Sequence, residues 1–115
     1  MPLEKWSDST VVVHLADDPQ FTDDVEGVEQ CLAAAQGGQG RCDAVLDFGS
    51  VRFVNSSNIA RLLRLRNRMA QQDNRLVLCN LTTQVWSAFL ITGLDKVFTF
   101  SDNVPTALAT LQIAS

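Results

Sequence analysis

The sequence predicts a single α/β domain over residues 1–115, with a mixed, mostly parallel sheet of about four to five strands, an N-terminal hairpin and about four helices. Short apolar runs bounded by turn residues alternate with longer segments in which apolar residues recur every three or four positions. Strands that alternate with helices favour parallel pairing through right-handed crossovers, with helices covering the sheet. The length is that of one ordinary domain, and no internal repeat, low-complexity tract or linker divides the chain.

The N-terminal part predicts a hairpin followed by a helix. Residues 3–6 and 10–15 have the composition of strands, and residues 7–9 form the turn between them. A helix follows, with Thr22 as its expected N-cap, because a side-chain oxygen at that position accepts an unpaired first-turn N–H. The glycine-rich connection at residues 37–40 is expected to end this helix.

The middle of the chain predicts a buried strand and the longest helix. Residues 44–48 are apolar without clean alternation, as expected of a parallel strand covered on both faces. After a short apolar stretch at residues 51–54, a polar quartet opens a helix from Ser56 to about Gln72. We expect its core side to be formed by Ile59, Leu62, Leu63, Met69 and Ala70. Arg66 falls near the middle of that side, so we expect its stem to pass the sheet edge and carry the charge to water.

The C-terminal part predicts two more strands and two more helices. The strands are expected at residues 75–79 and 97–100. A helix is expected between these two strands. The threonines at residues 82–83 are its expected caps, and Gly93 is placed to end it. We expect the apolar stripe of that helix to consist of Val85, Trp86, Phe89 and Leu90. Asp102 is expected to cap the last helix.

Composition and charge exclude several classes of protein. With 46% hydrophobic and 19% charged residues, the chain has an ordinary globular composition, so wholesale disorder is not expected. The net charge of −4 and the lack of a broad basic stripe argue against nucleic-acid binding. No apolar run approaches the roughly 20 residues of a membrane span, so no membrane insertion is expected. Because the first residues also lack the features of a secretory signal, we expect a cytoplasmic protein.

The sequence offers few residues for metal binding or catalysis. Cys31, Cys42 and Cys79 are widely spaced, which argues against a disulfide framework or a zinc site. His14 is the only histidine, and it lies in a predicted strand without a Cys or carboxylate partner nearby in the sequence, so no metal role is expected. Because no nucleophile–base pair and no glycine-rich phosphate loop is present, we expect no enzyme activity and no cofactor.

Two acidic residues are candidates for contact with a phosphate or a cation. Asp23 lies in the first turn of the first predicted helix, and Asp47 lies in the strand at residues 44–48. The simpler explanation of the carboxylates around residues 17–24 is that they solvate a loop and interact favourably with the helix dipole.

The long helix carries basic residues on its predicted exposed side. Arg61, Arg64 and Arg68, with Leu65 among them, follow the spacing i, i+3, i+4 and i+7. The sequence places no compensating acid on that side, and arginine is enriched at protein interfaces. We therefore predict a docking surface for an acidic partner, and a plain solvated helix face is the alternative.

Several segments together resemble a STAS domain, the fold of bacterial anti-sigma-factor antagonists. The family pattern joins a strand, an Asp-Ser-Ser-Gly-Leu helix start, a Gly-Arg-Leu-Val-Leu-like strand and a Gly-Leu pair before the last strand. At the same spacing this chain has Val45-Leu46-Asp47, Asn55-Ser56-Ser57-Asn58-Ile59, Asn74-Arg75-Leu76-Val77-Leu78 and Thr92-Gly93-Leu94-Asp95-Lys96-Val97-Phe98. It departs from the pattern at Asn55, which stands in place of Asp and is still able to cap the helix, and at Asn58, which stands in place of Gly.

The resemblance implies a regulatory role controlled by phosphorylation. In the family, a partner anti-sigma factor acts as a kinase on the first serine after the Asp, and only the unmodified antagonist binds that partner well. This serine corresponds to Ser56, with Ser57 as the second choice. We expect the partner-binding residues to be Asn55, Asn58, Ile59, Arg61, Arg64, Leu65 and Arg68. The oligomeric state stays open between a monomer and a weak dimer.

Three other interpretations remain open at the level of sequence. Ser56 and Ser57 are ordinary helix caps in the simplest of them. In the second, the chain is a STAS subunit that needs no phosphorylation and docks on the cytoplasmic ATPase of a transporter. In the third, it is a small nucleotide- or ligand-binding module that uses Asp23, Asp47 and the helix start at Ser56.

Overall fold

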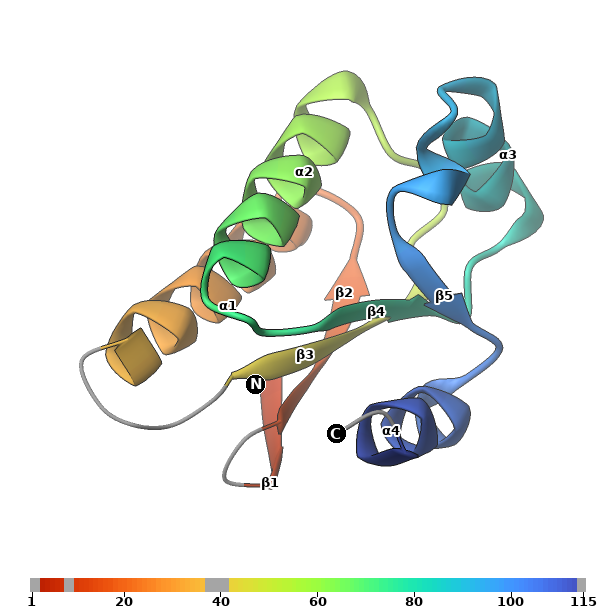
Figure 1. Ribbon diagram of the computed structural model, residues 1–115. Coiled ribbons are helices and arrows are strands. Elements are labelled where there is room, and N and C mark those ends of the chain that lie inside the picture. The colour runs from red at the N-terminus through yellow and green to blue at the C-terminus, as the bar shows by residue number, and fades with distance from the viewer. Residues whose placement is uncertain (1–2, 8–9, 37–41, 114–115) are drawn as a thin grey trace.

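The described part of the chain forms one five-stranded sheet with helices on both faces (Figure 1). The structure is a computed structural model that describes residues 3–7, 10–36 and 42–113. The strands lie in the order β1-β2-β3-β4-β5, with bounds Leu3–Ser7, Thr10–Ala16, Asp43–Ser50, Leu76–Cys79 and Thr99–Ser101. β1 pairs antiparallel with β2, and the other neighbours pair in parallel. The predicted mixed, mostly parallel sheet with an N-terminal hairpin is confirmed.

Within the described ranges, the first three α-helices cover one face of the sheet and the last α-helix covers the other (Figure 1). The helices are α1 (Gln20–Gln36), α2 (Ser56–Gln71), α3 (Thr83–Ile91) and α4 (Val104–Ile113), and a short 3₁₀ helix, η1, spans Leu94–Lys96. Because β2 to β5 follow one another in space, right-handed crossovers place α1, α2 and α3 on the same face. Each helix begins at the carboxyl edge of the parallel strands. None of the described helices is both long and apolar enough to cross a membrane.

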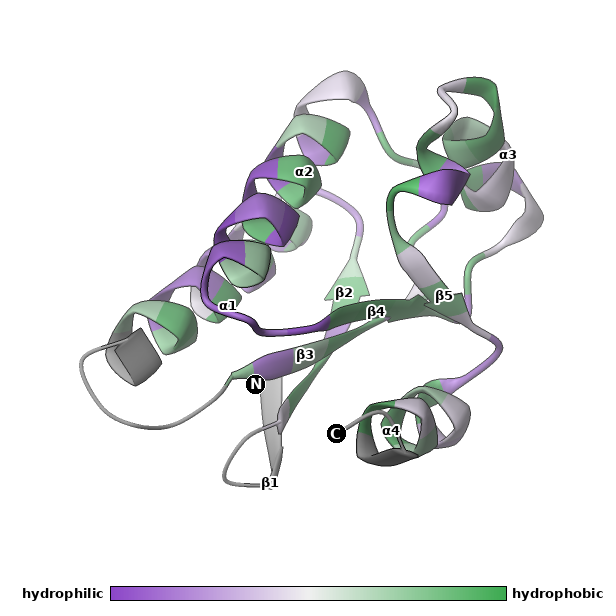
Figure 2. Cartoon of the chain, in the orientation of Figure 1, coloured by the Kyte–Doolittle hydropathy of each residue, from purple (hydrophilic) through white to green (hydrophobic). Residues whose placement is uncertain are grey.

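Alternating strand residues divide the core into two layers. On β2, Val11 and Val13 belong to the layer beneath α1, α2 and α3, whereas Val12 belongs to the layer beneath α4. Phe89 of α3 anchors that helix on the sheet, and its ring meets the ring of Phe48 edge to face at 6.4 Å between centroids. Figure 2 shows that β2 and β4 are largely hydrophobic, whereas α2 mixes hydrophobic and hydrophilic residues along its length.

The order of the elements is as predicted, but several boundaries differ: β3 runs from Asp43 to Ser50, past the predicted end at residue 48, and the starts of α1 and β5 also differ. α1 begins at Gln20, so Thr22 lies within the first turn and is not the N-cap. β5 begins two residues later than expected, because the preceding residues turn through η1 before the strand starts. The predicted turn at residues 8–9 and the glycine-rich connection at residues 37–40 lie outside the described residues.

The caps of the two C-terminal helices follow local hydrogen-bonding rules. Of the two threonines predicted as caps, Thr82 caps α3 by accepting the Val85 N–H, whereas Thr83 is the first residue of the helix. Gly93 follows the C-cap of α3 with a positive φ of 74°, which a glycine adopts without strain, so the prediction for this residue is also confirmed. The prediction that Asp102 caps α4 is wrong, because Asn103 accepts the N–H of the first turn.

Helix α2 buries a narrower stripe than the sequence predicted. Its buried residues are Asn58, Leu62, Leu65 and Met69. Leu65 is fully buried, so its predicted place on the exposed side is wrong. Ala70 is exposed, although it was expected in the core. Arg66 is half-buried, and its Nε donates a hydrogen bond of 3.1 Å to the carbonyl oxygen of Val97.

Candidate partner-binding site at the start of helix α2

Asn55 is the N-cap of helix α2. Its Oδ1 accepts the Asn58 N–H at 2.8 Å, and its own N–H donates to Asn58 Oδ1 at 3.0 Å. This reciprocal capping box satisfies backbone donors that the helix itself leaves unpaired. The expectation that Asn55 caps the helix in place of the family's Asp is therefore confirmed.

Ser56 and Ser57 are the first two residues of α2, and both are exposed. Because Asn55 occupies the cap position, the interpretation of the two serines as the helix cap is wrong. Within residues 3–7, 10–36 and 42–113, neither hydroxyl forms a hydrogen bond. The two hydroxyls therefore lie at the positive end of the helix dipole and are open to a partner or an enzyme.

Asn58 ties the start of α2 to the loop between β2 and α1. Its Nδ2 donates to Asp18 Oδ2 at 3.0 Å, and Thr22 Oγ1 donates to the other oxygen of that carboxylate at 3.1 Å. The hydrogen bond from Asn58 is the main reason why the pKa of Asp18 lies below its ordinary value. Since Asn58 is only 4% exposed, the prediction that it belongs to the partner-binding surface is wrong.

We expect Asn58→Ala to lower the free energy of unfolding by about 1–2 kcal/mol. The change removes the hydrogen bond to Asp18 and leaves the Asn55 N–H without its side-chain acceptor. Urea unfolding followed by circular dichroism measures the effect, with Asn67→Ala as the matched control on the exposed side of the same helix. Equal stability of the two variants would show that the capping box contributes nothing.

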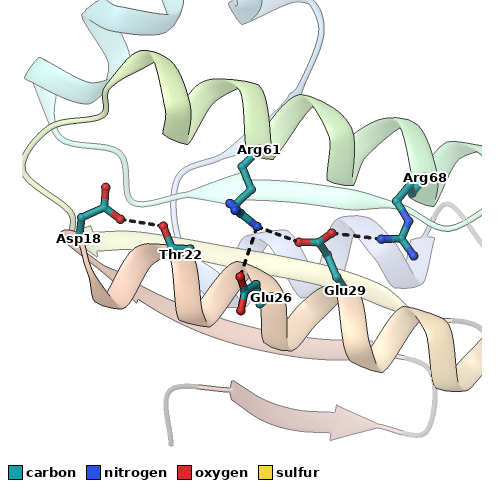
Figure 3. A network of polar contacts seen from close by, with 6 residues as sticks. All are labelled: Asp18, Thr22, Glu26, Glu29, Arg61 and Arg68. Atoms are coloured by element: carbon teal, nitrogen blue, oxygen red, sulfur yellow. Dashed lines mark hydrogen bonds and ion pairs between the residues drawn. The ribbon is translucent and has the colours of Figure 1, made fainter.

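Two of the predicted docking arginines are engaged with helix α1 (Figure 3). Arg61 Nη1 lies 3.4 Å from Glu29 Oε1 and 3.7 Å from Glu26 Oε1. Arg68 Nη1 lies 3.1 Å from Glu29 Oε2. The expectation that no acid compensates this basic patch is therefore wrong. Ion pairs as exposed as these contribute up to about 1 kcal/mol each to the free energy of unfolding. Their main effect is therefore to orient α2 against α1.

Arg64 is the exposed arginine of this group. In the part of the chain that the structure describes, no ion pair or hydrogen bond involves its guanidinium. Arg64 lies on the exposed stripe of α2 with Ser57 and Ala60, at the spacing i, i+3 and i+7 from Ser57. Of the predicted basic patch, Arg64 alone keeps a charge that a partner can approach without breaking a contact to α1.

Three large exposed apolar residues, which we call the apolar rim, were not predicted as functional residues. Phe53 in the loop before α2 is 64% exposed, and Leu90 and Ile91 at the end of α3 are 48% and 85% exposed. The loop before α2 and the end of α3 both lie beyond the carboxyl edge of the sheet (Figure 1). The expectation that Leu90 packs in the core is wrong. The signal was present in the sequence, because Phe89, Leu90 and Ile91 are consecutive and cannot all face one side of a helix.

Asp47 is held in a polar cluster on the α4 face of the sheet. One oxygen accepts the Gly49 N–H at 2.9 Å and Asn80 Nδ2 at 3.0 Å, and the other lies 2.7 Å from His14 Nδ1. Burial raises the pKa of Asp47, but these three hydrogen bonds outweigh it and bring the pKa below its ordinary value. Asp47 is a carboxylate partner of His14 that lies far away in the sequence, because the strand register of β2 and β3 places the two residues opposite each other.

The other candidate ligands do not assemble into a site. Asp23 is exposed in the first turn of α1, and no contact joins it to Asp47 among the described residues. No group of three or more His, Cys, Asp or Glu side chains in the described ranges is arranged to hold a metal ion. Cys31 and Cys42 are distant in sequence, yet their sulfur atoms lie 3.5 Å apart as free thiols. Burial is the main reason why the pKa of Cys42 rises to about 12.

Comparison with known proteins connects this chain to one family. A family model for the STAS domain matches residues 5–107. BtrV of Bordetella bronchiseptica, by name a candidate anti-sigma factor antagonist, is 30% identical over 81 residues, which are 70% of this chain and 70% of that protein.

Solved structures share the whole fold. A variant of RsbS from Moorella thermoacetica superposes with a TM-score of 0.76 at 20% identity and covers 99% of this chain and 98% of its own. SpoIIAA of Bacillus in its phosphorylated form has a TM-score of 0.66 at 20% identity and covers 95% of this chain and 96% of its own. Since the family model spans most of the sequence and the fold agrees throughout, the chain belongs to the STAS domain family.

Proposed function

We propose that this chain is a regulatory binding module of the anti-sigma factor antagonist type, in which phosphorylation of Ser56 controls association with an anti-sigma factor that acts as the kinase. One observation carries this proposal: the Ser56 hydroxyl is exposed at the start of α2 while Asn55 performs the capping. The existence of SpoIIAA in a phosphorylated form supports it, as does the likeness to BtrV.

The start of α2 suits a group that carries negative charge. A phosphoryl group adds about −1.5 to −2 charge and three acceptor oxygens. The N–H groups of Ser56 and Ser57 have no acceptor within the helix, and the first turn of α2 contains no acidic residue. At such a helix terminus the added charge stabilises the fold by about 0.3–1 kcal/mol. Phosphorylation of Ser56 is therefore compatible with an intact domain.

The surface around Ser56 suits a partner with apolar and acidic groups. The apolar rim provides hydrophobic contact area at the same end of the molecule, and Arg64 provides a positive charge on the exposed stripe of α2. Asn55, which is exposed, and Ile59, which is half-buried, complete the proposed surface. A phosphate placed against acidic groups of that partner makes the free energy of binding less favourable by several kcal/mol. Each 1.4 kcal/mol of that change lowers the affinity about tenfold.

Incubation with the cognate anti-sigma kinase and ATP is expected to add one phosphate to the chain. Intact-mass spectrometry should show one added phosphate on the wild type and on Ser57→Ala, and none on Ser56→Ala. Because both serines have equivalent exposed positions and neither is the cap, each alanine variant is expected to fold. A phosphate that persists in Ser56→Ala and disappears in Ser57→Ala would move the site by one residue, and an unchanged mass of the wild type would remove phosphorylation from the proposal.

A further inference from the structure

Cys31 and Cys42 form a close pair of thiols at the amino end of β3. Cys31 lies in α1, Cys42 directly precedes β3, and Cys42 Sγ donates to Cys31 Sγ at 3.5 Å. A disulfide bond is about 2.0 Å long, so the two sulfur atoms need to approach each other by about 1.5 Å. Small rotations about the Cα–Cβ bonds of the two residues provide a movement of this size.

The fold holds the backbone of each cysteine in place. Cys31 is within the hydrogen-bonded pattern of α1, which continues to Gln36. The Cys42 N–H donates to Asn74 Oδ1 at 3.1 Å, across the sheet edge from the loop between α2 and β4. Cys42 belongs to the core layer beneath α1, α2 and α3, and Cys31 packs against the same layer. The contact between the two sulfur atoms is therefore a product of the tertiary structure.

The three cysteines differ in their access to an oxidant. Cys31 is partly exposed, whereas Cys42 is 3% exposed. Burial, and then the contact with Cys31, raises the pKa of Cys42 to about 12, so the Cys42 thiol is protonated at neutral pH. Because the thiolate is the form that attacks an oxidant, Cys31 reacts first. Cys79 is fully buried in the other core layer, beneath α4, so the sheet separates it from the pair.

We propose that Cys31 and Cys42 are a redox modification site at which a hydroperoxide closes an intramolecular disulfide. The Cys31 thiolate attacks one peroxide oxygen, the O–O bond breaks, and Cys31 becomes a sulfenic acid while the peroxide is reduced to an alcohol, or to water if it is hydrogen peroxide. The Cys42 sulfur then attacks the Cys31 sulfur, the S–S bond forms, and the hydroxyl group leaves with the Cys42 proton as water. The distance of 3.5 Å makes this second step intramolecular, which offsets the low thiolate fraction of Cys42.

The disulfide joins the second half of α1 to the start of β3. It links residues that are eleven positions apart. Constraining the unfolded chain with a loop of this length should raise the melting temperature by about 5–15 °C. Cys42 precedes β3 and Ser56 follows it, so the disulfide forms at the opposite end of the strand and leaves the start of α2 uncovered.

Treatment of the full chain with hydrogen peroxide, followed by alkylation under denaturing conditions and mass spectrometry, tests this site. We expect the number of alkylated thiols to fall from three to one, and the dithiol dithiothreitol to restore all three. Trypsin cleaves after Arg41 and so places Cys31 and Cys42 on different peptides, which makes the expected crosslink directly visible. Sulfinic acid at Cys31 without a crosslink, or a crosslink to Cys79 or to a second chain, overturns the proposal.

Two alanine variants provide the matched comparison. Cys31→Ala removes the partly exposed thiol, so both remaining thiols should stay alkylatable after peroxide treatment and the melting temperature should not rise. Cys79→Ala removes the thiol of the other core layer and should form the same crosslink as the wild type. Circular dichroism establishes that each variant is folded. Equal loss of thiols in the two variants, or a melting temperature that does not rise when the wild type is crosslinked, would contradict the assignment.

Discussion

The Ser56→Glu variant is expected to lose about a hundredfold in affinity for the anti-sigma factor partner while its fold stays intact. The added carboxylate lies in the first turn of α2, where it interacts favourably with the helix dipole, so the free energy of unfolding should be unchanged or up to about 1 kcal/mol higher. In the proposed complex, the same charge would face acidic groups of the partner. Isothermal titration calorimetry gives the affinity, and urea unfolding gives the stability.

Two controls separate charge from size and from position. Ser56→Gln has nearly the same shape as Ser56→Glu without the charge, so its affinity should lie close to that of the wild type. Gln71→Glu adds the same charge to the exposed far end of α2 and should also bind normally. If Ser56→Gln and Ser56→Glu lose affinity equally, steric exclusion explains the effect and the electrostatic mechanism is wrong.

Phe89→Ala is expected to lower the free energy of unfolding by about 3–5 kcal/mol. The Phe89 ring is fully buried and meets the rings of Phe98 and Phe100 edge to face, at 5.6 and 5.5 Å between centroids. Its removal leaves a cavity between α3 and the sheet. Chemical unfolding measures this loss of stability. The loss is large compared with the total free energy of unfolding of a typical domain, which is about 5–15 kcal/mol.

Phe53→Ala is the matched control, because it deletes the same side chain from an exposed position. Its effect on stability should stay within about 0.5 kcal/mol. Its affinity for the partner should fall about tenfold, because aromatic residues at interface centres carry much of the binding energy. A strong loss of stability in Phe53→Ala, or none in Phe89→Ala, would show that the two phenylalanines have been assigned to the wrong roles.

The fold was largely predictable from local patterns. Two patterns carried most of the prediction: the apolar run at residues 44–48 and the three- to four-residue periodicity of α2. Both patterns arise because buried positions are apolar, so each can be recognised within the sequence of a single element. The caps Asn55 and Thr82 also follow local rules, because their hydrogen bonds close within three residues. The start of α1 was less predictable, since several polar residues in a row are acceptable at a helix terminus.

The site was predictable only where it depends on local geometry. The exposure of Ser56 follows from its place next to a cap. The burial of Leu65, by contrast, depends on which of two overlapping helical stripes meets the sheet. The pairing of Arg61 and Arg68 with Glu29 depends on how α1 packs against α2, across a separation of more than thirty residues. No periodicity within one helix contains that information.

Hydrogen–deuterium exchange of the complex is the most direct measurement of where the partner binds. The amides of Ser56 and Ser57 have no acceptor within α2, so they should exchange rapidly in the free chain. Binding of the anti-sigma factor should slow both of them, while the first amide of α4, at Val104 beneath the other face of the sheet, should exchange as before. Unchanged exchange at Ser56 and Ser57 in a saturated complex, with protection elsewhere, would contradict the claim that the start of α2 is the docking site.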